Sequence, residues 1–453
     1  MSRTRPVMIR KLLTFATLLA ASPAFAQTQP PPAADPGQEE FVADVTGAED
    51  SVFRVAVPVF ATPQAASTAA GNTTALGQQI AEVIVTDLRN SRRFQPTGPG
   101  GLPAPSFGNV QSPNYSTWAG LGADNLIQGY VQANADGTLT VGCYLFDVDG
   151  QSQRARQGFV IQPGEWRRAA HRCADQIYGN LTADSGFFDT RVVYVAESGP
   201  PGRRRKQLAI MDYDGANHRF LTQGQWTVLT PRFAPDQRTI TFMSYENERP
   251  RVYILDMATG RVRPLVEGPY QTFAPRYSPD SRTIVFSMAQ NGNTDVYSVP
   301  VTGGTPRRLT NAPGIDTGGS FSPDGRQIVF ESDRGGSQQI YVMNADGSNP
   351  RRISFGGGGA ATPEWSPRGD LIAYTQTGSF RIGVMRPDGG GARLLTRDAG
   401  EGPTWAPNGR AIMYQRGLGR GQVWYVDVAS GATRRVPTPL EGSDPSWSAL
   451  RPN

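Results

Sequence analysis

A unit of about 44 residues recurs in the second half of the chain, and each copy has the same order of apolar and polar positions. A short apolar segment ends in an aromatic residue, a turn of the Pro-Asp-Gly type follows, and an alternating strand comes next, as in Phe321–Phe330. The turns begin at Ala234, Ser278, Ser322, Ser366 and Ala406, which are 44, 44, 44 and 40 residues apart. A fixed period of roughly 20–50 residues is typical of solenoids, propellers and arrays.

The rest of each copy predicts two more strands. One resembles Val252–Asp256 and ends in a Thr-Gly or Asp-Gly hairpin signal, and a short strand beginning with arginine follows, as at Arg263. Four strands with no helical pattern between them are typical of a propeller blade. A sixth copy begins at Arg191 without its first strand, and Asp444–Ser448 near the C-terminus supplies the missing piece. We therefore predict a six-bladed all-β propeller over residues 190–453, closed by the C-terminal strand.

The preceding region mixes helical and strand patterns. Apolar residues at helical spacing, from Leu76 to Leu88, predict a helix that Thr73 opens with a hydroxyl cap, and Glu165–Leu181 predicts a second one. A short helix is expected at 115–122. Strands are expected at 52–60, 93–96, 125–132, 138–147 and around 158–161. These elements predict a small α/β domain over residues 51–182.

The N-terminus has the pattern of an export signal. Basic residues from Arg3 to Lys11 precede the apolar stretch Leu12–Ala21 and the small-residue cleavage site Ala24–Ala26. The apolar stretch is shorter than the roughly 20 residues that a bilayer span needs. We expect residues 1–26 to be a signal peptide, residues 27–50 to be a flexible Pro- and Ala-rich arm, and no membrane span after the signal is removed.

Export changes the interpretation of charge and cysteines. Loss of residues 1–26 leaves 40 basic and 39 acidic side chains, so the high pI gives no case for nucleic-acid binding. Cys143 and Cys173 both remain in the mature chain. In an oxidising compartment they either pair or stay as two thiols, and the spacing alone does not decide between these.

Catalytic motifs are sparse. The two histidines, His171 and His218, fall in different predicted domains, which disfavours zinc sites and a Ser-His-Asp triad. The sequence has no Gly-x-Ser-x-Gly elbow and no phosphate-binding loop. Asp147–Gly150 and Asp212–Gly215 resemble half of a calcium loop, but both follow predicted strands and are better explained as turns. We expect no enzymatic activity, no metal and no cofactor.

Several stretches resemble the TolB family, the periplasmic component of the Tol–Pal envelope system, when taken together with six blades. They are Val55–Phe60, Asp87–Pro96, Trp118–Gly129, Gly186–Val195 and Asp212–Asn217. The resemblance implies a monomeric, non-enzymatic periplasmic protein with two partners, the lipoprotein Pal and the inner-membrane protein TolA. It implies that the protein links them, for outer-membrane integrity and for constriction at cell division.

The resemblance also implies where the partners bind. Pal is expected over the propeller mouth, in the loops ahead of the first strands. The matching residues here are Gln271, Thr272, Phe273, Thr317, Ala361, Thr362, Glu401, Ser443 and Asp444. TolA is expected on the N-terminal arm, whose matching residues are Phe41, Val42, Ala43, Asp44 and Val45.

Two other functions fit a propeller. An exported propeller that binds glycan or peptidoglycan needs exposed aromatic residues at the mouth, and Trp226, Tyr270 and Phe273 keep that alternative open. A propeller lyase or lactonase needs several Asp, Glu, Asn or His side chains on the channel-side strands. The segments around the Pro-Asp-Gly turns are mainly apolar and Gly-rich, so we expect a channel with little charge.

Overall fold

The computed structural model describes residues 52–452 apart from 201, 247, 357 and 418–419. The described part lies in one compact unit, Glu49–Asn453. The predicted signal peptide, the arm and its TolA segment, Phe41–Val45, lie outside the described residues. Within the described part, no helix is both long enough and apolar enough to cross a membrane.

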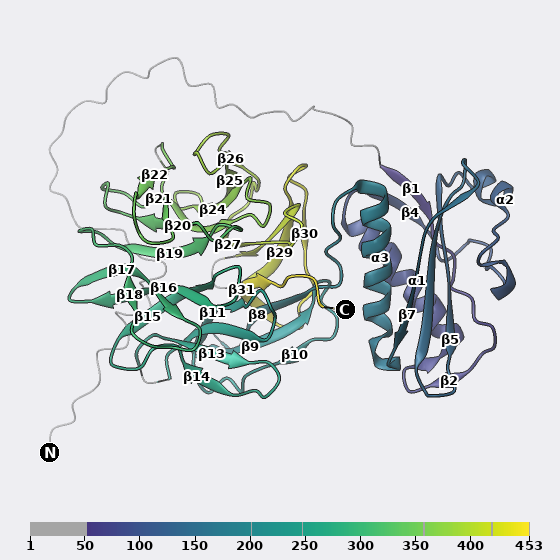
Figure 1. Ribbon diagram of the computed structural model, residues 1–453, viewed down its shortest axis with the longest axis horizontal. Coiled ribbons are helices and arrows are strands. Elements are labelled where there is room, and N and C mark those ends of the chain that lie inside the picture. The colour runs from purple at the N-terminus through teal and green to yellow at the C-terminus, as the bar shows by residue number, and fades with distance from the viewer. Residues whose placement is uncertain (1–51, 201, 247, 357, 418–419, 453) are drawn as a thin grey trace, which may run out of the picture. The chain divides into compact units, whose positions relative to one another are not determined.

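The first part of this unit is built on a five-stranded sheet with the order β4-β1-β5-β6-β7 (Figure 1). Its strands are β1 (Phe53–Ala56), β4 (Phe94–Thr97), β5 (Asn125–Ala133), β6 (Leu139–Asp147) and β7 (Ser152–Ile161), and β2 (Ser67–Thr68) and β3 (Gly71–Asn72) form a separate hairpin. β1 pairs in parallel with β4 and β5, and β5, β6 and β7 form an antiparallel meander. Two short 3₁₀ turns, Phe107–Asn109 and Pro163–Glu165, complete the connections.

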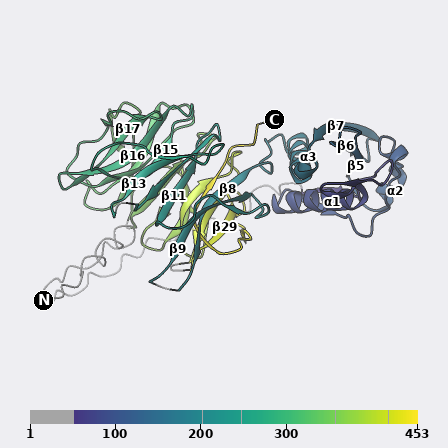
Figure 2. The same ribbon diagram turned by 90° about the horizontal axis from the view of Figure 1, so that it is seen from below.

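Helices cover both faces of this sheet. α1 (Thr73–Asn90) and α3 (Trp166–Thr182) pack against each other and against β5, β6 and β7 (Figures 1 and 2). α2 (Tyr115–Gly120) places Trp118 in a second cluster with Leu126 and Phe146. The expected hydroxyl cap of α1 is wrong: the Asn72 side chain accepts from the Thr74 amide, and the Thr73 hydroxyl instead accepts from the Ala66 amide.

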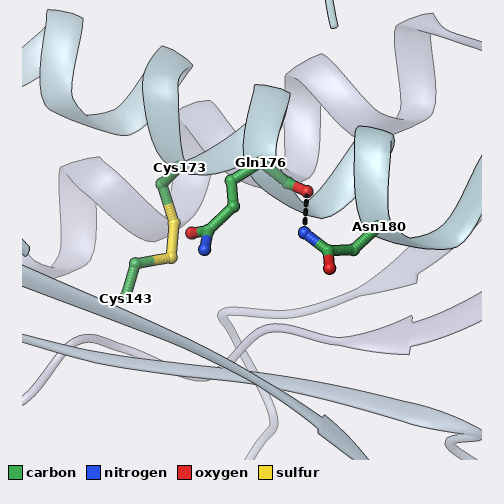
Figure 3. Close-up of a disulfide and its surroundings, with 4 residues drawn as sticks. All are labelled: Cys143, Cys173, Gln176 and Asn180. Atoms are coloured by element: carbon green, nitrogen blue, oxygen red, sulfur yellow. Dashed lines mark hydrogen bonds between the residues drawn. A yellow bond between two sulfur atoms is a disulfide. The ribbon is translucent and has the colours of Figure 1, made fainter. Parts of the chain in front are cut away.

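A disulfide joins Cys143 on β6 to Cys173 on α3 (Figure 3). Both residues are fully buried in the core between the sheet and the helix. One turn further along α3, the Asn180 side chain donates to the Gln176 carbonyl at 2.8 Å. The disulfide therefore fixes α3 to β6 in the sheet that the helix covers.

Six four-stranded antiparallel sheets follow among the described residues, which confirms the six-bladed propeller. Blade 1 is β11 (Val228–Phe233) to β14 (Val262–Pro264), with β12 (Thr239–Ser244) and β13 (Arg251–Asp256). Blade 2 is β15 (Gln271–Tyr277), β16 (Thr283–Gln290), β17 (Asn293–Pro300) and β18 (Arg307–Arg308). Blade 3 is β19 (Asp316–Phe321), β20 (Gln327–Ser332), β21 (Gln339–Asn344) and β22 (Arg351–Arg352). Blade 4 is β23 (Ala360–Trp365), β24 (Ile372–Gln376), β25 (Arg381–Met385) and β26 (Arg393–Leu394). Blade 5 is β27 (Gly400–Trp405), β28 (Ala411–Arg416), β29 (Gln422–Asp427) and β30 (Thr433–Arg435).

Blade 6 combines both ends of the propeller region. β31 (Glu441–Trp447) pairs with β8 (Arg191–Ser198), which continues to β9 (Arg205–Asp212) and β10 (Arg219–Phe220). The first strand of each blade contacts that of the next, and β31 contacts β11, so these six inner strands form a closed ring around the channel. The predicted closure by the C-terminal strand is confirmed.

An arginine on the outer strand of one blade donates to a backbone carbonyl of the next blade, and this contact recurs. Arg307 donates to the Asp346 carbonyl at 2.8 Å, Arg351 to Pro387 at 3.1 Å and Arg393 to Val428 at 2.7 Å. Arg263 makes the same contact with Val301. In blades 1 to 4, an arginine on the outer strand is therefore a clamp to the following blade.

The Pro-Asp-Gly turns all lie at one end of the propeller, which we call the turn face, because each one follows an inner strand. The linker from α3 contacts this face at blades 4 and 5. Asp184 accepts from Arg368 at 3.1 Å and from Arg410 at 2.9 Å, and Asn408 donates to the Ser185 carbonyl at 3.0 Å. In most copies of the turn an Asp precedes an Arg, whereas blade 4 has the reverse order, and its Arg368 meets the linker.

Candidate functional site

All six inner strands carry the same irregularity near the start, at the end opposite the turn face. Each has a register shift against its partner strand, and one residue in each shift has a left-handed backbone. These residues are Thr230, Ala274, Gly318, Thr362, Gly402 and Asp444, with φ between 47° and 69°. Such bulges re-aim side chains and are found at rims and binding sites. They form a ring around the channel opening, and we call the ring and the loops around it the mouth.

At four of the six bulges, the amide of the left-handed residue bonds to a side chain of the preceding blade. Gly318 donates to the Ser287 hydroxyl at 3.3 Å, Thr362 donates to the Glu331 carboxylate at 2.6 Å and Gly402 donates to the Thr375 hydroxyl at 3.3 Å. Between blades 6 and 1, the Thr230 amide donates to the Asp444 carboxylate. The mouth is thus held from blade to blade by polar contacts, which fix the positions of its side chains.

The predicted Pal-contact residues lie along this ring. Thr362 is exposed, and Gln271, Phe273, Glu401 and Asp444 are partly exposed. Thr272, Thr317, Ala361 and Ser443 are buried. Thr272 accepts from the Val252 amide at 2.9 Å and Ser443 donates to Glu197 at 2.7 Å, so these two side chains brace neighbouring strands.

Glu331 is a mouth residue that the sequence analysis missed. One of its carboxylate oxygens accepts from the Thr317 hydroxyl and the other from the Thr362 amide, so it joins blade 3 to blade 4. The repeat contains a signal for this role of Glu331. Ser287 and Thr375 occupy the same repeat position in their blades, and each accepts a hydrogen bond from an amide of the following blade.

Acidic groups gather where blades 5 and 6 meet. Burial raises the pKa of Glu401, and the charge of Asp444 adds to this while Lys206 opposes it. Burial also raises the pKa of Asp444, and Lys206 and the Thr230 amide oppose that shift. Lys206 forms an ion pair with Glu197 at 3.0 Å. This side of the mouth therefore holds several carboxylates around one lysine.

The channel below the mouth holds more charge than expected. Arg276 of blade 2 donates to Glu364 of blade 4 at 3.0 Å. These blades are not neighbours, so the ion pair lies across the channel. Arg232 occupies the same position in blade 1 and is buried. The expectation of an apolar, Gly-rich channel is wrong, because charged side chains occupy repeat positions where other blades have Ser or Thr.

Large apolar side chains are exposed on the loops that lead into the inner strands. Trp226, Ile315 and Phe355 precede β11, β19 and β23, and they are 47%, 36% and 74% exposed. Tyr270, by contrast, packs against the core of blade 2. The loops ahead of blades 1, 3 and 4 thus place exposed apolar side chains beside the polar ring, a combination that protein interfaces use.

A second cluster lies between α1, α3 and blade 6. The Asp87 carboxylate accepts from the Tyr213 hydroxyl at 2.6 Å and bonds His171 Nδ1 at 2.7 Å, and both Asp87 and His171 are fully buried. Asp214 lies beside them and would complete a set of three possible metal ligands. However, its oxygens accept from Arg167 and from the Ala216 amide. Each carboxylate oxygen of Asp87 and Asp214 already accepts a hydrogen bond, so the cluster is better explained as an ion-pair network than as a metal site.

The proton of this network lies on histidine at neutral pH. Burial by itself lowers the pKa of His171, but the charge and hydrogen bond of Asp87, with Asp214 and Asp212 nearby, outweigh burial and raise it to about 9. Nε2 of His171 has no hydrogen-bond partner among the described residues. The buried Asp87–His171 pair therefore joins α1 to α3, and the cluster reaches the propeller through the Tyr213–Asp87 hydrogen bond and the Arg167–Asp214 ion pair.

Comparison with known proteins gives matches over both parts of the chain. Residues 178–451 match the model of the TolB beta propeller domain, and residues 41–154 match that of the TolB amino-terminal domain. Tol-Pal system protein TolB 1 of Novosphingobium aromaticivorans is 60% identical over 98% of this chain and 100% of its own. The TolB of Rhizorhabdus wittichii is 61% identical over 92% of this chain and 97% of its own.

A solved structure agrees with these matches. The crystal structure of TolB from Acinetobacter baumannii covers 88% of this chain and 97% of its own, with a TM-score of 0.76 and 27% identity. The relatives that match over nearly the whole chain are envelope-system proteins, and this excludes the lyase and lactonase alternatives.

Proposed function

The chain belongs to the TolB family of the Tol–Pal system, and from this premise we propose that it links Pal to TolA in the periplasm, with Pal on the propeller mouth. It acts as a non-enzymatic binding protein that supports outer-membrane integrity and constriction during division. The N-terminal signal supports export, and the mature chain works without a cofactor.

The observation that carries the proposal is the ring of six bulges. A left-handed backbone is costly for β-branched residues such as Thr230 and Thr362, and such strain is concentrated at functional sites. The exposed Trp226, Ile315 and Phe355 surround this ring and provide the apolar contacts that stable complexes need. The other end of the propeller carries the linker, so the mouth is left for a partner.

The test is binding of the mature protein to purified Pal by isothermal titration calorimetry. Thr362→Arg places a bulky cation on the mouth and should weaken binding at least about ten-fold. Thr302→Arg, at an exposed position in a turn of blade 2 at the opposite end, is the matched control and should bind like the unmodified protein. Equal affinity of both variants would contradict a Pal site at the mouth.

The glycan-binding alternative is measured in the same experiment. If the unmodified protein does not bind Pal but binds muropeptides, the glycan-binding alternative is supported. Trp226 should then be replaced first, because it is an exposed aromatic side chain on a mouth loop. Binding of Pal with no response to muropeptides would remove this alternative.

TolA binding is proposed for the arm around Phe41–Val45. A mature chain that begins at residue 51 keeps every described element and should still bind Pal. It should lose binding to purified TolA, since the segment that matches the family is gone. TolA binding by the shortened chain would contradict this assignment.

A further inference from the structure

Neighbouring inner strands are joined by a polar contact on the channel side. At four of the six junctions, a side chain at one repeat position accepts a hydrogen bond from the amide of the aromatic residue that ends the next inner strand. The four pairs of acceptor side chain and amide are Ser320 and Trp365 at 3.4 Å, Glu364 and Trp405 at 3.1 Å, Thr404 and Trp447 at 3.3 Å, and Ser446 and Phe233 at 3.3 Å. At these junctions the donor and the acceptor both belong to the protein.

The other two junctions have donors on both sides. Blades 1 and 2 carry Arg232 and Arg276 at the repeat position, and a guanidinium has no acceptor. The amides that end the next inner strands belong to Tyr277 and Phe321. In the part of the chain that the structure describes, neither amide has a side-chain acceptor. An acceptor from outside the protein would therefore complete each junction.

The two arginines differ in how their charge is compensated. Arg276 donates to Glu364 across the channel at 3.0 Å. Arg232 is only 8% exposed and forms no ion pair with any described residue. Its Nη1 donates to the carbonyl of the preceding Pro231 at 2.7 Å, and its Nε is buried without a hydrogen-bond partner among the same residues. A buried charge without a counter-charge is costly, so the environment of Arg232 favours an anion.

Two acids could supply the missing charge, and both are engaged elsewhere. The carboxylate oxygens of Glu364 both accept hydrogen bonds, one from Arg276 and the other from two groups of blade 5. Asp444 at the mouth accepts from the Thr230 amide, and burial raises its pKa, which disfavours its charged form. The charge of Arg232 thus remains for an external anion.

A second polar side chain accompanies Arg232. Thr241 of β12 is its partner in the strand register, and the Thr241 hydroxyl is buried with no hydrogen bond to any residue that the structure describes. In the other five blades the residue in this register position is apolar. These residues are Val285, Val329, Ala373, Met413 and Val193. Blade 1 therefore combines a buried guanidinium with a buried hydroxyl, and both groups can donate to one anion.

We propose that the propeller channel binds a small inorganic anion of the size of chloride at the junction of blades 1 and 2. The Arg232 guanidinium supplies the charge, and the Thr241 hydroxyl and the Tyr277 amide supply hydrogen bonds. The anion takes the place of the acceptor side chain that four other junctions have. A small anion is favoured over a larger one because Arg232 and Thr241 are both buried.

The direct test uses bromide as the probe. Crystals of the unmodified mature protein soaked in sodium bromide should give an anomalous difference peak beside the Arg232 guanidinium. Arg232→Ser gives blade 1 the residue that blades 3 and 6 have at this position, with an oxygen that can accept from the Tyr277 amide. Its crystals should lack the peak. Water instead of bromide beside Arg232 in the unmodified protein would overturn the proposal.

Thermal unfolding in solution separates specific binding from binding at crystal concentration only. It compares sodium chloride with sodium methanesulfonate, a larger anion, at equal ionic strength. The Tm of the unmodified protein should be about 2–4 °C higher in chloride, and that of Arg232→Ser should not differ between the salts. Arg326→Ser, the same change at an exposed position of the turn face, should keep the chloride effect. No chloride effect in the unmodified protein, or an equal one in Arg232→Ser, would contradict the site.

Discussion

At the scale of single residues, Thr230 combines two unfavourable features. Its φ of 47° is left-handed, which a β-branched side chain rarely adopts, and its hydroxyl is buried without a hydrogen-bond partner among the described residues. The Thr230 amide bonds Asp444 across the blade junction, and this contact holds the backbone at the bulge. The left-handed backbone and the unpaired hydroxyl of Thr230 both lower the stability of the protein, in a bulge that shapes the mouth.

Thr230→Asn should therefore stabilise the protein. Asn adopts the left-handed region more easily than Thr, so we expect a gain of about 1 kcal/mol. Urea unfolding measures the gain. Thr227→Asn, three residues earlier and with an ordinary backbone, is the control and should give no gain.

His171 makes stability depend on pH. Its pKa is about 9 in the folded protein and about 6.5 when unfolded, so its contribution is complete below pH 6.5 and is lost as pH rises through 9. The loss should be on the order of 3 kcal/mol. Urea unfolding from pH 6 to 10 should show this slope, and His171→Gln should flatten it. A parallel slope in the variant would assign the effect to other groups.

The backbone conformation of the six bulges could not be predicted from the sequence. Five of the six left-handed residues precede a proline, and a residue in that position is expected to be extended. The repeat predicted the strands correctly, but local preference predicted the wrong backbone at the mouth. The ring of neighbouring blades imposes this conformation, and a sequence pattern within one blade does not contain that information.

At the scale of elements, adjacent blades are joined by the outer arginines as well as by their apolar cores. Arg393 is partly buried, and burial lowers its pKa while Asp427 opposes the shift. It donates to the Val428 carbonyl of the next blade. The repeated arginine was visible in the sequence, but its acceptor was not, because that carbonyl lies 35 residues further along the chain.

Arg393→Met keeps most of the side-chain volume and removes the clamp between blades 4 and 5. We expect a loss of about 1–2 kcal/mol, because a partly buried carbonyl loses a charged donor. Arg397→Met changes an exposed arginine in the same region and should cost little. Chemical denaturation measures the free energy of unfolding of both variants. An equal decrease in the two variants would show that the Arg393 clamp does not stabilise the propeller.

The disulfide makes α3 part of the sheet that it covers. Replacing Cys143 and Cys173 with Ser frees a loop whose ends are 30 residues apart and should lower stability by about 3 kcal/mol. The reduced unmodified protein should match the variant in thermal unfolding. A variant as stable as the oxidised protein would show that packing alone holds α3. The sequence left the pairing open because it shows the spacing of the cysteines but not their geometry.

At the scale of the whole molecule, the linker contacts decide how firmly the two parts are joined. Asp184 meets Arg368 and Arg410 on two blades, and its side chain is partly buried. The reversed Asp and Arg of the blade 4 turn was visible in the sequence as a degraded repeat. Its cause was not visible, because the partner lies 184 residues earlier.

Asp184→Asn should make the linker more accessible. Limited proteolysis near residues 182–190 should become faster, because two charged contacts are weakened. Arg368→Asn should have a smaller effect of the same kind, since Arg410 remains. In a double-mutant cycle the two changes should be less than additive. Strict additivity would show that Asp184 and Arg368 are not coupled.

The closure of blade 6 has a consequence for biosynthesis. Because β31 is the last strand made and pairs with β8, the ring stays open until the final residues have crossed the inner membrane. Until then β8 has an unpaired edge, which invites aggregation and proteolysis. A premature stop that removes residues 441–453 would remove β31 and leave this edge exposed permanently. We therefore expect a truncated copy to be degraded or to aggregate before it competes with the complete protein for partners.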